Sequence, residues 1–582
     1  MAVLTVAQIL SGGSLGLVSG LDDLLVAEIG GRRVLYGLNR AENRLVELSV
    51  GPGGGLTFDG FLVLAGTIAA GADAQLGLAS FASGAELLAV SGLAAVDGQM
   101  ISLTGTGELG TQQTLSGIGA LAHPTGLQVG GAPVLVSGGP AGGLVHYADI
   151  GSGYVQGAGL TDAPDRYLAD VSASVGFVSA GTTYVATASP AEAGVNVASV
   201  TAAGLAQTGA LGAADGLPIS TPSDLAALER LDETLLVVAS LGTSSLSVLQ
   251  VEAGVPTLAD HIYDSDATRF QGAAAVSALV HGDFAFLAAG GAEGGVSLMT
   301  VLPGGRLVHL GSVAEDETVA LDQIKTLDVF VDGGALQIVA GSANEPGLVR
   351  LSYDLSDTGA VVLANPDGAG VTGTALDDQL IGSVVGETLS GLAGDDILLD
   401  ARGNDVLIGG AGADLFVFTA DGQTDQIADF ERGVDRLDLS GFDFLYDVSQ
   451  LSITPTANGA ILNFGNETIF VTTADAAPLT VADLSNPDIL NVDRPPFLLI
   501  GREIVGTSAD ETLIGGPGDD TIAGAGGADS LVGAAGIDLL LGSFGNDTLA
   551  GEGDRDTLVG GAGDDMLWGG DGGDVLYGDD VA

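Results

Sequence analysis

The chain has 582 residues, of which 95 are glycine and none is cysteine, and its formal net charge is -58. A chain so poor in lysine and arginine is not expected to bind nucleic acid, because that affinity comes from neutralised phosphates, and anionic lipid surfaces would repel it. Disulfides and thiolate metal sites are excluded, whereas hard cations that prefer carboxylate oxygens, calcium above all, are the expected counter-ions.

The composition indicates a folded chain without a membrane span. Hydrophobic residues make up 46% of it, so the acidic charge is not accompanied by the low hydrophobicity of disordered proteins. No apolar run is long enough to predict a membrane-spanning helix. The first residues, MAVLTVAQILSGGSLG, contain no basic segment, so we expect no Sec-type signal peptide.

Residues 1–365 are predicted to form a seven-bladed β-propeller. A short apolar segment that ends in small residues recurs at intervals of about 50 residues and starts at Val34, Leu87, Val134, Tyr184, Leu235, Phe286 and Gln337. A second strand follows most copies, as in RLVELSV and SLSVLQV. Such units indicate four-stranded blades, and LTVAQ, residues 4–8, is expected to complete the last blade. A pair of β-sandwiches or a solenoid is the alternative.

No catalytic motif stands out in this part of the chain. GGSLG, residues 12–16, fits G-x-S-x-G around Ser14, but a Gly/Ser-rich chain gives such matches by chance. The sole lysine, Lys325, is not in a phosphate-binding loop, and the zinc-protease motif HExxH is absent. The histidines lie in separate predicted blades, at His123, His146, His261, His281 and His309. HIYDSD, residues 261–266, is the best candidate for a polar loop site, and we interpret it as a solvated turn.

Two blocks of nine-residue repeats follow. From Gly373 to Val417 the sequence divides into GTALDDQLI, GSVVGETLS, GLAGDDILL, DARGNDVLI and GGAGADLFV. From Gly506 to Tyr577 it divides into eight further units, such as GGPGDDTIA and GGAGDDMLW. Position six is acidic and position eight is large and apolar in all thirteen units. A flexible Gly/Asp-rich linker, which is the alternative, would not keep an apolar column.

The repeat has a physical interpretation. Glycines at positions one, two and four permit tight turns with positive φ, and the last three residues form a short strand whose position-eight side chain enters a thin core. We expect two units to make one turn of a right-handed parallel β-roll, so that units n and n+2 stack at the strand spacing of ~4.8 Å. The stacked position-six carboxylates repel one another without a cation, whereas calcium takes them and turn carbonyls as ligands.

This pattern resembles the G-G-x-G-x-D-x-U-x nonapeptide of RTX, or hemolysin-type, calcium-binding β-rolls. The resemblance implies Ca²⁺ as the cofactor, with the position-six side chains as ligands: Asp378, Glu387, Asp396, Asp405 and Asp414 in the first roll, and Glu511, Asp520, Asp529, Asp538, Asp547, Asp556, Asp565 and Asp574 in the second. If only stacked pairs bind, five units give at most three ions and eight units at most six.

Some units depart from the consensus. Glu387 and Glu511 put a longer side chain at position six. The glycine of position four is replaced in four units, by Leu376, Val385, Ala509 and Asp554, and Asp400 replaces a first glycine. We expect weaker sites at these units.

Residues 418–490, between the rolls, are predicted to be a β-rich capping module. Segments such as AILNFG and ETIFVTT indicate strands. FVF at 416–418 and DQIADFERGVDRLDLS at 425–440 resemble the end module of serralysin-type proteases and other type I secretion substrates. A linker, residues 491–505, then leads to the second roll, residues 506–582. In that family the secretion signal usually lies beyond the repeats, so either the internal module serves here or the sequence is a fragment.

These features predict a secreted bacterial calcium-binding protein that leaves the cell by type I secretion. Ions that bind only the folded rolls stabilise them by about 1.4 kcal/mol per site at tenfold saturation, hence on the order of 8 to 13 kcal/mol for six to nine sites. The rolls are then expected to stay unfolded in a calcium-poor cytosol and to fold outside.

We expect the propeller to be a binding, adhesion or structural module with a cell-surface or matrix partner. An exported propeller hydrolase, of phosphatase, lactonase or phytase type, is the alternative; the convergent His, Arg and acidic loops that it needs are not evident.

Overall fold

The structure is a computed structural model that describes residues 2–10, 21–65, 68, 74–80, 86–91, 97–119, 121–139, 142–149, 154–163, 166–231, 233–316, 319, 321–345, 347–366, 368–495, 503–516, 518–534, 536–553, 555–570 and 572–578. Ser14 and Asp554 lie outside these residues. The chain divides into two compact units; the larger contains the propeller, the first roll and its cap, and the smaller contains the second roll. Within the described ranges, no helix has both the length and the apolar character needed to cross a membrane.

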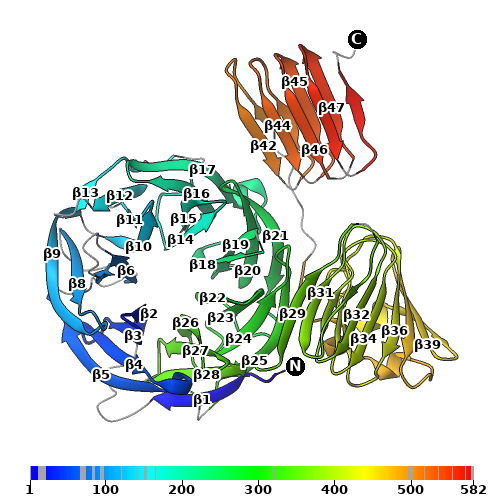
Figure 1. Cartoon of the computed structure of the whole chain (residues 1–582), viewed down its shortest axis with the longest axis horizontal. Helices are drawn as coiled ribbons and strands as arrows, with labels where there is room; N and C mark the ends of the chain where they lie inside the picture. Colours follow the sequence, from blue (N-terminus) through cyan, green and yellow to red (C-terminus); the bar gives the residue numbers. More distant parts are fainter. Residues whose placement is uncertain are drawn as a thin grey trace. The chain divides into compact units, whose positions relative to one another are not determined.

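A seven-bladed β-propeller occupies the first part of the larger unit, as predicted, and every blade is a four-stranded antiparallel sheet (Figure 1). The first six blades are β2 (Leu21–Ile29), β3 (Arg32–Asn39), β4 (Arg44–Val50) and β5 (Leu56–Val63); β6 (Leu76–Ser80), β7 (Glu86–Val90), β8 (Asp97–Leu103) and β9 (Leu109–Gly119); β10 (Ala122–Val129), β11 (Ala132–Gly138), β12 (Leu144–Asp149) and β13 (Tyr154–Gln156); β14 (Ala173–Ser179), β15 (Thr182–Ser189), β16 (Gly194–Thr201) and β17 (Gly204–Gly212); β18 (Pro222–Arg230), β19 (Glu233–Ser240), β20 (Ser245–Glu252) and β21 (Val255–Tyr263); and β22 (Ala275–His281), β23 (Phe284–Gly290), β24 (Gly295–Val301) and β25 (Leu307–Ala314).

The seventh blade closes the ring. It consists of β26 (Ile324–Asp332), β27 (Ala335–Ser342), β28 (Leu348–Asp354) and the N-terminal β1 (Thr5–Leu10). β1 pairs antiparallel with β28, and Thr5 lies opposite Ser352. The expectation that the N-terminal strand completes the last blade is therefore confirmed.

The recurring apolar segment of the sequence is the second strand of each blade. It has a hydrogen-bonded neighbour on both sides, and in β23 every residue is buried. A strand that is covered on both faces has a continuous apolar sequence instead of an alternating one. This explains why this strand, of the four in each blade, gave the clearest signal.

Carboxylates on the innermost strands connect neighbouring blades. Asp23 accepts a hydrogen bond from the backbone N–H of Leu76 in the next blade at 2.7 Å, and Asp328 accepts one from the N–H of Val26 across the closure of the ring. Burial raises the pKa of Asp23 to about 8 and that of Asp328 to about 6. These acids thus hold the ring together.

The first roll has two sheets whose strands stack in parallel. One sheet contains β29 (Thr358–Leu363), β31 (Asp377–Ile381), β33 (Ile397–Leu399), β35 (Leu415–Val417) and β37 (Arg436–Asp438). The other contains β30 (Val371–Thr372), β32 (Thr388–Ala393), β34 (Val406–Ala411) and β36 (Thr424–Phe430), and it continues through β40 (Glu467–Thr473), β39 (Gly459–Phe464) and β38 (Ser452–Thr456). Leu398 lies opposite both Leu380 and Phe416, so units n and n+2 stack as expected.

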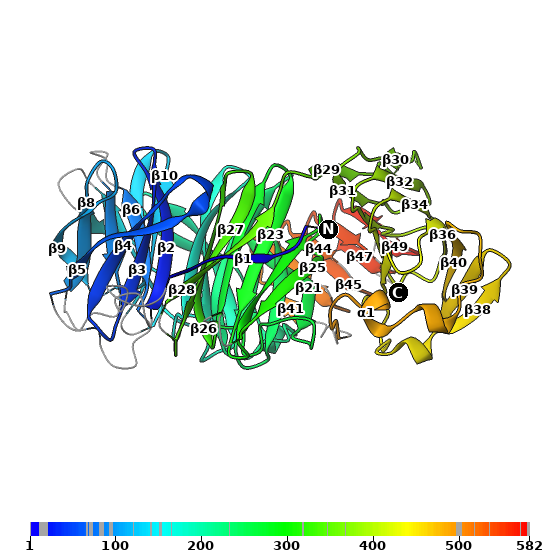
Figure 2. The same ribbon diagram turned by 90° about the horizontal axis from the view of Figure 1, so that it is seen from below.

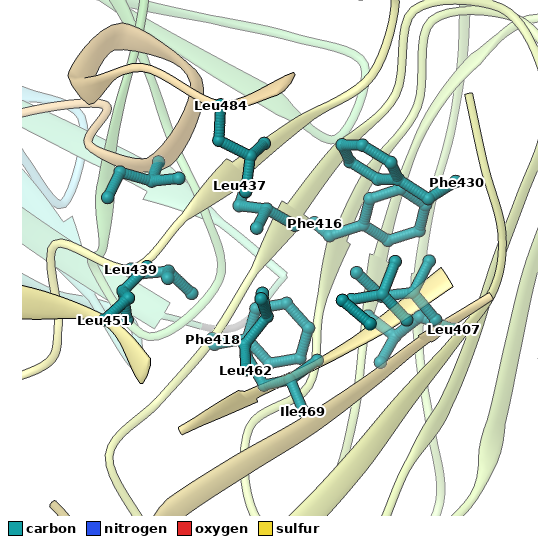
Figure 3. Close-up of a cluster of buried hydrophobic side chains, with 14 of the residues drawn as sticks. Leu407, Phe416, Phe418, Phe430, Leu437, Leu439, Leu451, Leu462, Ile469 and Leu484 are labelled. Carbon is teal, nitrogen blue, oxygen red and sulfur yellow. The ribbon is translucent and has the colours of Figure 1, made fainter. Parts of the chain in front are cut away.

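The capping segment extends the second sheet of the roll and closes its core. β36 pairs with β34 on one side and with β40 on the other, after which the hairpin strands β39 and β38 are antiparallel. The short helix α1 (Asn486–Ile489) follows. The position-eight column of the repeats merges into one apolar cluster with the cap, in which Figure 3 shows Leu407, Phe416, Phe430, Leu437 and Ile469.

The first sheet of the roll packs against the propeller blade of β22–β25 (Figure 2). Leu302 and Val308 of that blade are buried against residues at positions seven and nine of the repeats, which are Ile381, Ile397, Leu399, Leu415 and Val417. Positions that would face solvent in an isolated roll are therefore apolar on this sheet, because the propeller covers them.

Two buried arginines join the same parts of the larger unit. Arg306 of the propeller lies 3.3 Å from Asp438 of β37. Arg494 donates to both carboxylate oxygens of Asp260 in β21, at 2.7 and 2.9 Å, and to the hydroxyl of Ser440. Arg494 belongs to residues 491–505, the segment that the sequence predicts to be a linker. The first residues of this segment are bound to the propeller.

The second roll is a thinner version of the first. Its sheets are β41 (Glu503–Val505), β43 (Thr521–Ala523), β45 (Leu539–Phe544), β47 (Thr557–Ala562) and β49 (Val575–Tyr577), and β42 (Thr512–Gly516), β44 (Ser530–Ala534), β46 (Thr548–Glu552) and β48 (Met566–Gly570). Its core is the position-eight column Ile522, Leu531, Leu540, Leu549 and Leu558. One column of side chains buries little apolar area, so this roll depends more on other sources of stability than the first.

Candidate calcium sites

The position-six side chains form two rows of carboxylates in each roll, because units n and n+2 stack. Ten of them are at most 5% exposed: Asp378, Glu387, Asp396, Asp405 and Asp414 in the first roll and Asp520, Asp529, Asp538, Asp547 and Asp556 in the second. Glu511, Asp565 and Asp574, near the two ends of the second roll, are partly exposed. The fold thus places all thirteen predicted residues in four rows, two in each roll.

In most units one oxygen of the carboxylate bonds to the turn two units earlier. Asp396 Oδ1 accepts from the backbone N–H of Asp378 at 2.8 Å, and Asp414 Oδ1 accepts from that of Asp396 at 2.9 Å. The same bond, with its spacing of 18 residues, recurs along the second roll from the Glu511–Asp529 pair to the Asp556–Asp574 pair. These bonds fix the orientation of the carboxylates.

The other oxygen accepts no hydrogen bond in most units. It is buried and without a partner in Glu387, Asp396, Asp405, Asp414, Asp529, Asp538, Asp547 and Asp565. A buried acceptor left unsatisfied costs about 1–3 kcal/mol, and more when it is charged. A row of such oxygens is rare in native proteins unless an ion or water binds them.

The first-position glycines form cradles beneath these oxygens. A methyl group on Gly391 would overlap Asp396 Oδ2 and would lie 2.6 Å from the carbonyl oxygen of Gly409. The same pair of oxygens, a position-six carboxylate and a glycine carbonyl from the next turn, surrounds Gly515 and Gly551. Glycine is required here because any side chain would fill the space between the two oxygens.

The electrostatics of the rows favour a cation. Burial, as the largest cause, raises the pKa of Asp396, Asp405, Asp414 and Asp538 to about 7. Neighbouring carboxylates of the row raise these pKa values further. Without a cation these groups therefore hold protons near neutral pH, and a bound divalent cation would favour the ionised form.

The donor set fits calcium. In the described part of the chain, no three His, Cys, Asp or Glu side chains are grouped to hold a metal ion by themselves. An ion in the rows must therefore take backbone carbonyls in addition to carboxylates, and the cradles bring both together. Mixed carboxylate and carbonyl oxygens with no nitrogen or sulfur suit calcium.

Asp425 and Asp435 continue the two rows of the first roll beyond the last nonapeptide, and the sequence analysis missed them. Asp425 Oδ1 accepts from the N–H of Asp405 at 3.0 Å, and Asp435 Oδ1 accepts from that of Asp414 at 3.1 Å. Both are buried, and burial raises the pKa of each to about 6. Their spacings of 20 and 21 residues break the repeat. The signal that could have found them is the sequence D-x-I/L, which ends at Ile427 in one case and at Leu437 in the other.

Asp400 replaces a cradle glycine and behaves differently from the row. It is 2% exposed, and its Oδ1 accepts from the N–H of Thr419 at 2.9 Å. Burial, and then the charge of Asp425, raises its pKa well above the ordinary value. Glu387 uses Oε1 for the N–H of Ser383, at 2.7 Å. Both departures thus have local hydrogen-bond partners.

Comparison with known families agrees with this geometry. Residues 505–540 and 541–576 match the RTX calcium-binding nonapeptide repeat (4 copies), and residues 380–473 match the family described as Peptidase M10 serralysin C terminal. The chain is an RTX repeat protein. The serralysin match begins inside the first roll of this RTX protein and includes Asp425 and Asp435, so roll and cap are matched together.

Solved structures with similar folds are distant. They include BBS1N in complex with ARL6DN, soaked with mercury, with 13% identity and a TM-score of 0.42 over 61% of this chain and 98% of that chain. SapL1 lectin in complex with alpha methyl fucoside has 13% identity and a TM-score of 0.35 over 52% and 99%, and a functionally unknown protein from Desulfotomaculum acetoxidans DSM 771 has 14% and 0.35 over 52% and 92%. No curated protein matches the RTX chain.

The histidines of the propeller do not converge on one site. His261 Nδ1 lies 2.8 Å from Ser247 Oγ inside a blade, and His146 Nε2 lies 2.8 Å from the carbonyl of Thr201 in another. His309 Nε2 lies 2.8 Å from Ser312 Oγ. The prediction that the histidines lie in separate blades is wrong: His123 is buried in the same blade as His146, and His281, exposed at the end of β22, is in the same blade as His309. The interpretation of HIYDSD as a solvated turn is also wrong, because its first three residues end strand β21 and His261 is fully buried. Asp264, which follows the strand, accepts hydrogen bonds from Thr268 and Phe270.

Proposed function

We propose that this RTX protein is secreted and that its two rolls fold around a row of calcium ions, while the propeller serves as a binding, adhesion or structural module outside the cell. The observation that carries the proposal is the set of buried carboxylate oxygens without hydrogen-bond partners, most of them beside a glycine cradle. The thirteen position-six residues would hold the ions, and Asp425 and Asp435 would extend the two rows of the first roll.

Calcium would supply positive charge that cancels the repulsion between stacked carboxylates. The chain's own contribution is positional: in most units the 18-residue hydrogen-bond ladder holds one oxygen of the carboxylate and leaves the other free for an ion. Because the unfolded chain has no such arrangement, binding free energy becomes folding free energy. Export in the unfolded state from a calcium-poor cytosol, followed by folding outside, is consistent with the serralysin-type match.

The two rolls would have different roles. The first is packed on the propeller and has a large shared core with its cap, so calcium there would stabilise the propeller as well. The second has only a thin column of core residues, so it would depend most on calcium. For the alternative, a hydrolase in the propeller, the described residues offer no group of three His, Cys, Asp or Glu side chains that could hold a metal ion.

Circular dichroism of the intact protein tests the calcium dependence. Addition of a chelator is expected to remove a large part of the strand signal, and addition of calcium but not of magnesium should restore it. A strand signal that is unchanged by chelation would contradict the proposal. Export is tested separately, by expression with and without a type I exporter and measurement of the protein in the culture medium.

A further inference from the structure

A small cavity lies where the propeller meets the first roll, at the end of a row of position-six carboxylates, and Asp378 of that row is among its lining residues. We name it the junction cavity; it is lined by Phe286, Thr300 and Tyr353 of the propeller and by Asp377, Gln379 and Asp395 of the roll, among others. Its volume is about 30 Å³. Since about 10–15 Å³ is enough for one water molecule, the cavity has room for a dehydrated ion or one or two waters.

Gln379 places an unsatisfied oxygen in this cavity. The residue is 1% exposed. Its Nε2 donates to Thr300 Oγ1 at 2.8 Å, which sets the direction of the amide, and its Oε1 has no hydrogen-bond partner. A buried amide oxygen without a partner is costly, so the cavity is suited to a group that this oxygen can bind.

Two carboxylates complete the roll side of the cavity. Asp377 stands two residues before Gln379 in β31, so both side chains are on the same face of the strand. Asp395 lies next to Asp377 in the following turn, and Asp377 Oδ1 accepts from its backbone N–H at 2.7 Å. No lysine, arginine or histidine lines the cavity. The walls thus offer acceptor oxygens and negative charge, with aromatic rings that limit access to water.

We propose that the junction cavity is a binding site for a hard divalent cation of the calcium class, held by Asp377, Asp395 and the amide oxygen of Gln379. It is distinct from the row sites, because Asp378, the position-six residue that also lines the cavity, has its oxygens bonded to the N–H groups of Ala360 and Thr374. An ion here would bridge propeller and roll. A water molecule in the cavity is the competing occupant.

The test compares two isosteric substitutions in the intact protein. Asp377→Asn removes one charge from the cavity, and its amide oxygen still accepts the Asp395 N–H. Asp519→Asn is the matched control, because Asp519 has the same repeat position and accepts from the N–H of Ile537 at 2.8 Å in the second roll. Calcium bound per chain is measured by elemental analysis after gel filtration in calcium buffer.

Asp377→Asn is expected to bind one calcium ion fewer per chain than the wild type, while Asp519→Asn binds the full number. An unchanged count for Asp377→Asn would overturn the proposal in favour of water. Loss of several ions together would also overturn it, since Asp377 would then support the roll and not a site of its own. These outcomes do not depend on whether the protein is secreted or on what the propeller binds.

A second substitution distinguishes a bound cation from a bound water molecule by whether it raises or lowers the thermal stability of the protein in calcium. Gln379→Glu adds a carboxylate at the same position. If a cation occupies the cavity, thermal stability in calcium is expected to stay at the wild-type level or rise, and it should fall on chelation more than in the wild type. A large loss of stability in calcium would contradict the proposal, because it would show a buried charge without a counter-ion.

Discussion

The buried Arg494–Asp260 pair makes a sharp prediction about how the first roll is joined to the propeller. Asp260 is 3% exposed and accepts from Arg494 at 2.7 and 2.9 Å. It also accepts from the N–H of Leu307 at 2.8 Å. Although burial opposes ionisation, the nearby guanidinium lowers the pKa of Asp260 below its ordinary value. We therefore expect Arg494→Ala to leave an ionised carboxylate buried without its partner.

Loss of one partner of a buried ion pair typically costs about 3–5 kcal/mol. The matched control is Arg432→Ala, because Arg432 pairs with Asp475 at the surface, where the side chains are 31% and 53% exposed. Exposed pairs contribute about 0.2–1 kcal/mol. The same substitution by alanine is thus predicted to lower the free energy of unfolding by several kcal/mol more at Arg494 than at Arg432.

Urea unfolding of the intact protein in saturating calcium, followed by circular dichroism, measures the loss of stability caused by each substitution. Arg494→Ala should lower the midpoint of the larger unit strongly, and Arg432→Ala should lower it little. In the double variant with Asp260→Leu, much of the loss should be recovered, since no charge is then left buried. Equal effects of the two single substitutions would refute the view that this pair holds roll and propeller together.

Three further predictions concern the calcium rows. Gly391→Ala should weaken calcium binding in isothermal titration, because the added methyl group would enter the cradle. The control Gly60→Ala, whose added carbon has no atom within 4 Å, should bind calcium as the wild type does. Asp425→Asn and Asp435→Asn should each reduce the calcium bound per chain measured by elemental analysis; a full complement in both would show that the rows end with Asp405 and Asp414. In calcium-free buffer the rolls should keep more of their strand signal in circular dichroism at pH 5 than at pH 8. The pKa values of Asp396, Asp405, Asp414 and Asp538 are raised to about 7 in the fold, so their contribution is present at low pH and is lost as the pH rises through about 7; a strand signal that rises with pH would contradict these shifts.

The sequence predicted the parts of the fold that repeat. The position-eight column and the second strand of each blade are apolar because they are covered on both sides, and such positions keep their pattern from copy to copy. The rows of carboxylates followed from the same regularity. Asp425 and Asp435 were missed because insertions shift them out of the 18-residue register, although their hydrogen bonds are the same.

Contacts between non-repeating parts could not be predicted. Arg494 looks like a residue of a linker in the sequence, since its partner Asp260 lies 234 positions away. Gln379 takes position seven of its unit, where other units have serine, threonine or apolar residues, and its contact with Thr300 depends on how the roll packs on the propeller. Such pairs have no period, and only the folded chain shows which side chains meet.

Hydrogen exchange of the intact protein, with and without calcium, tests the central claim most directly. The claim is that calcium bound along the rows of carboxylates folds the rolls. Peptides from residues 503–578 should be protected in calcium and should lose nearly all protection on chelation, while those from the propeller strands β14–β24 should keep most of theirs. Equal protection of the second roll in the two conditions would contradict the account.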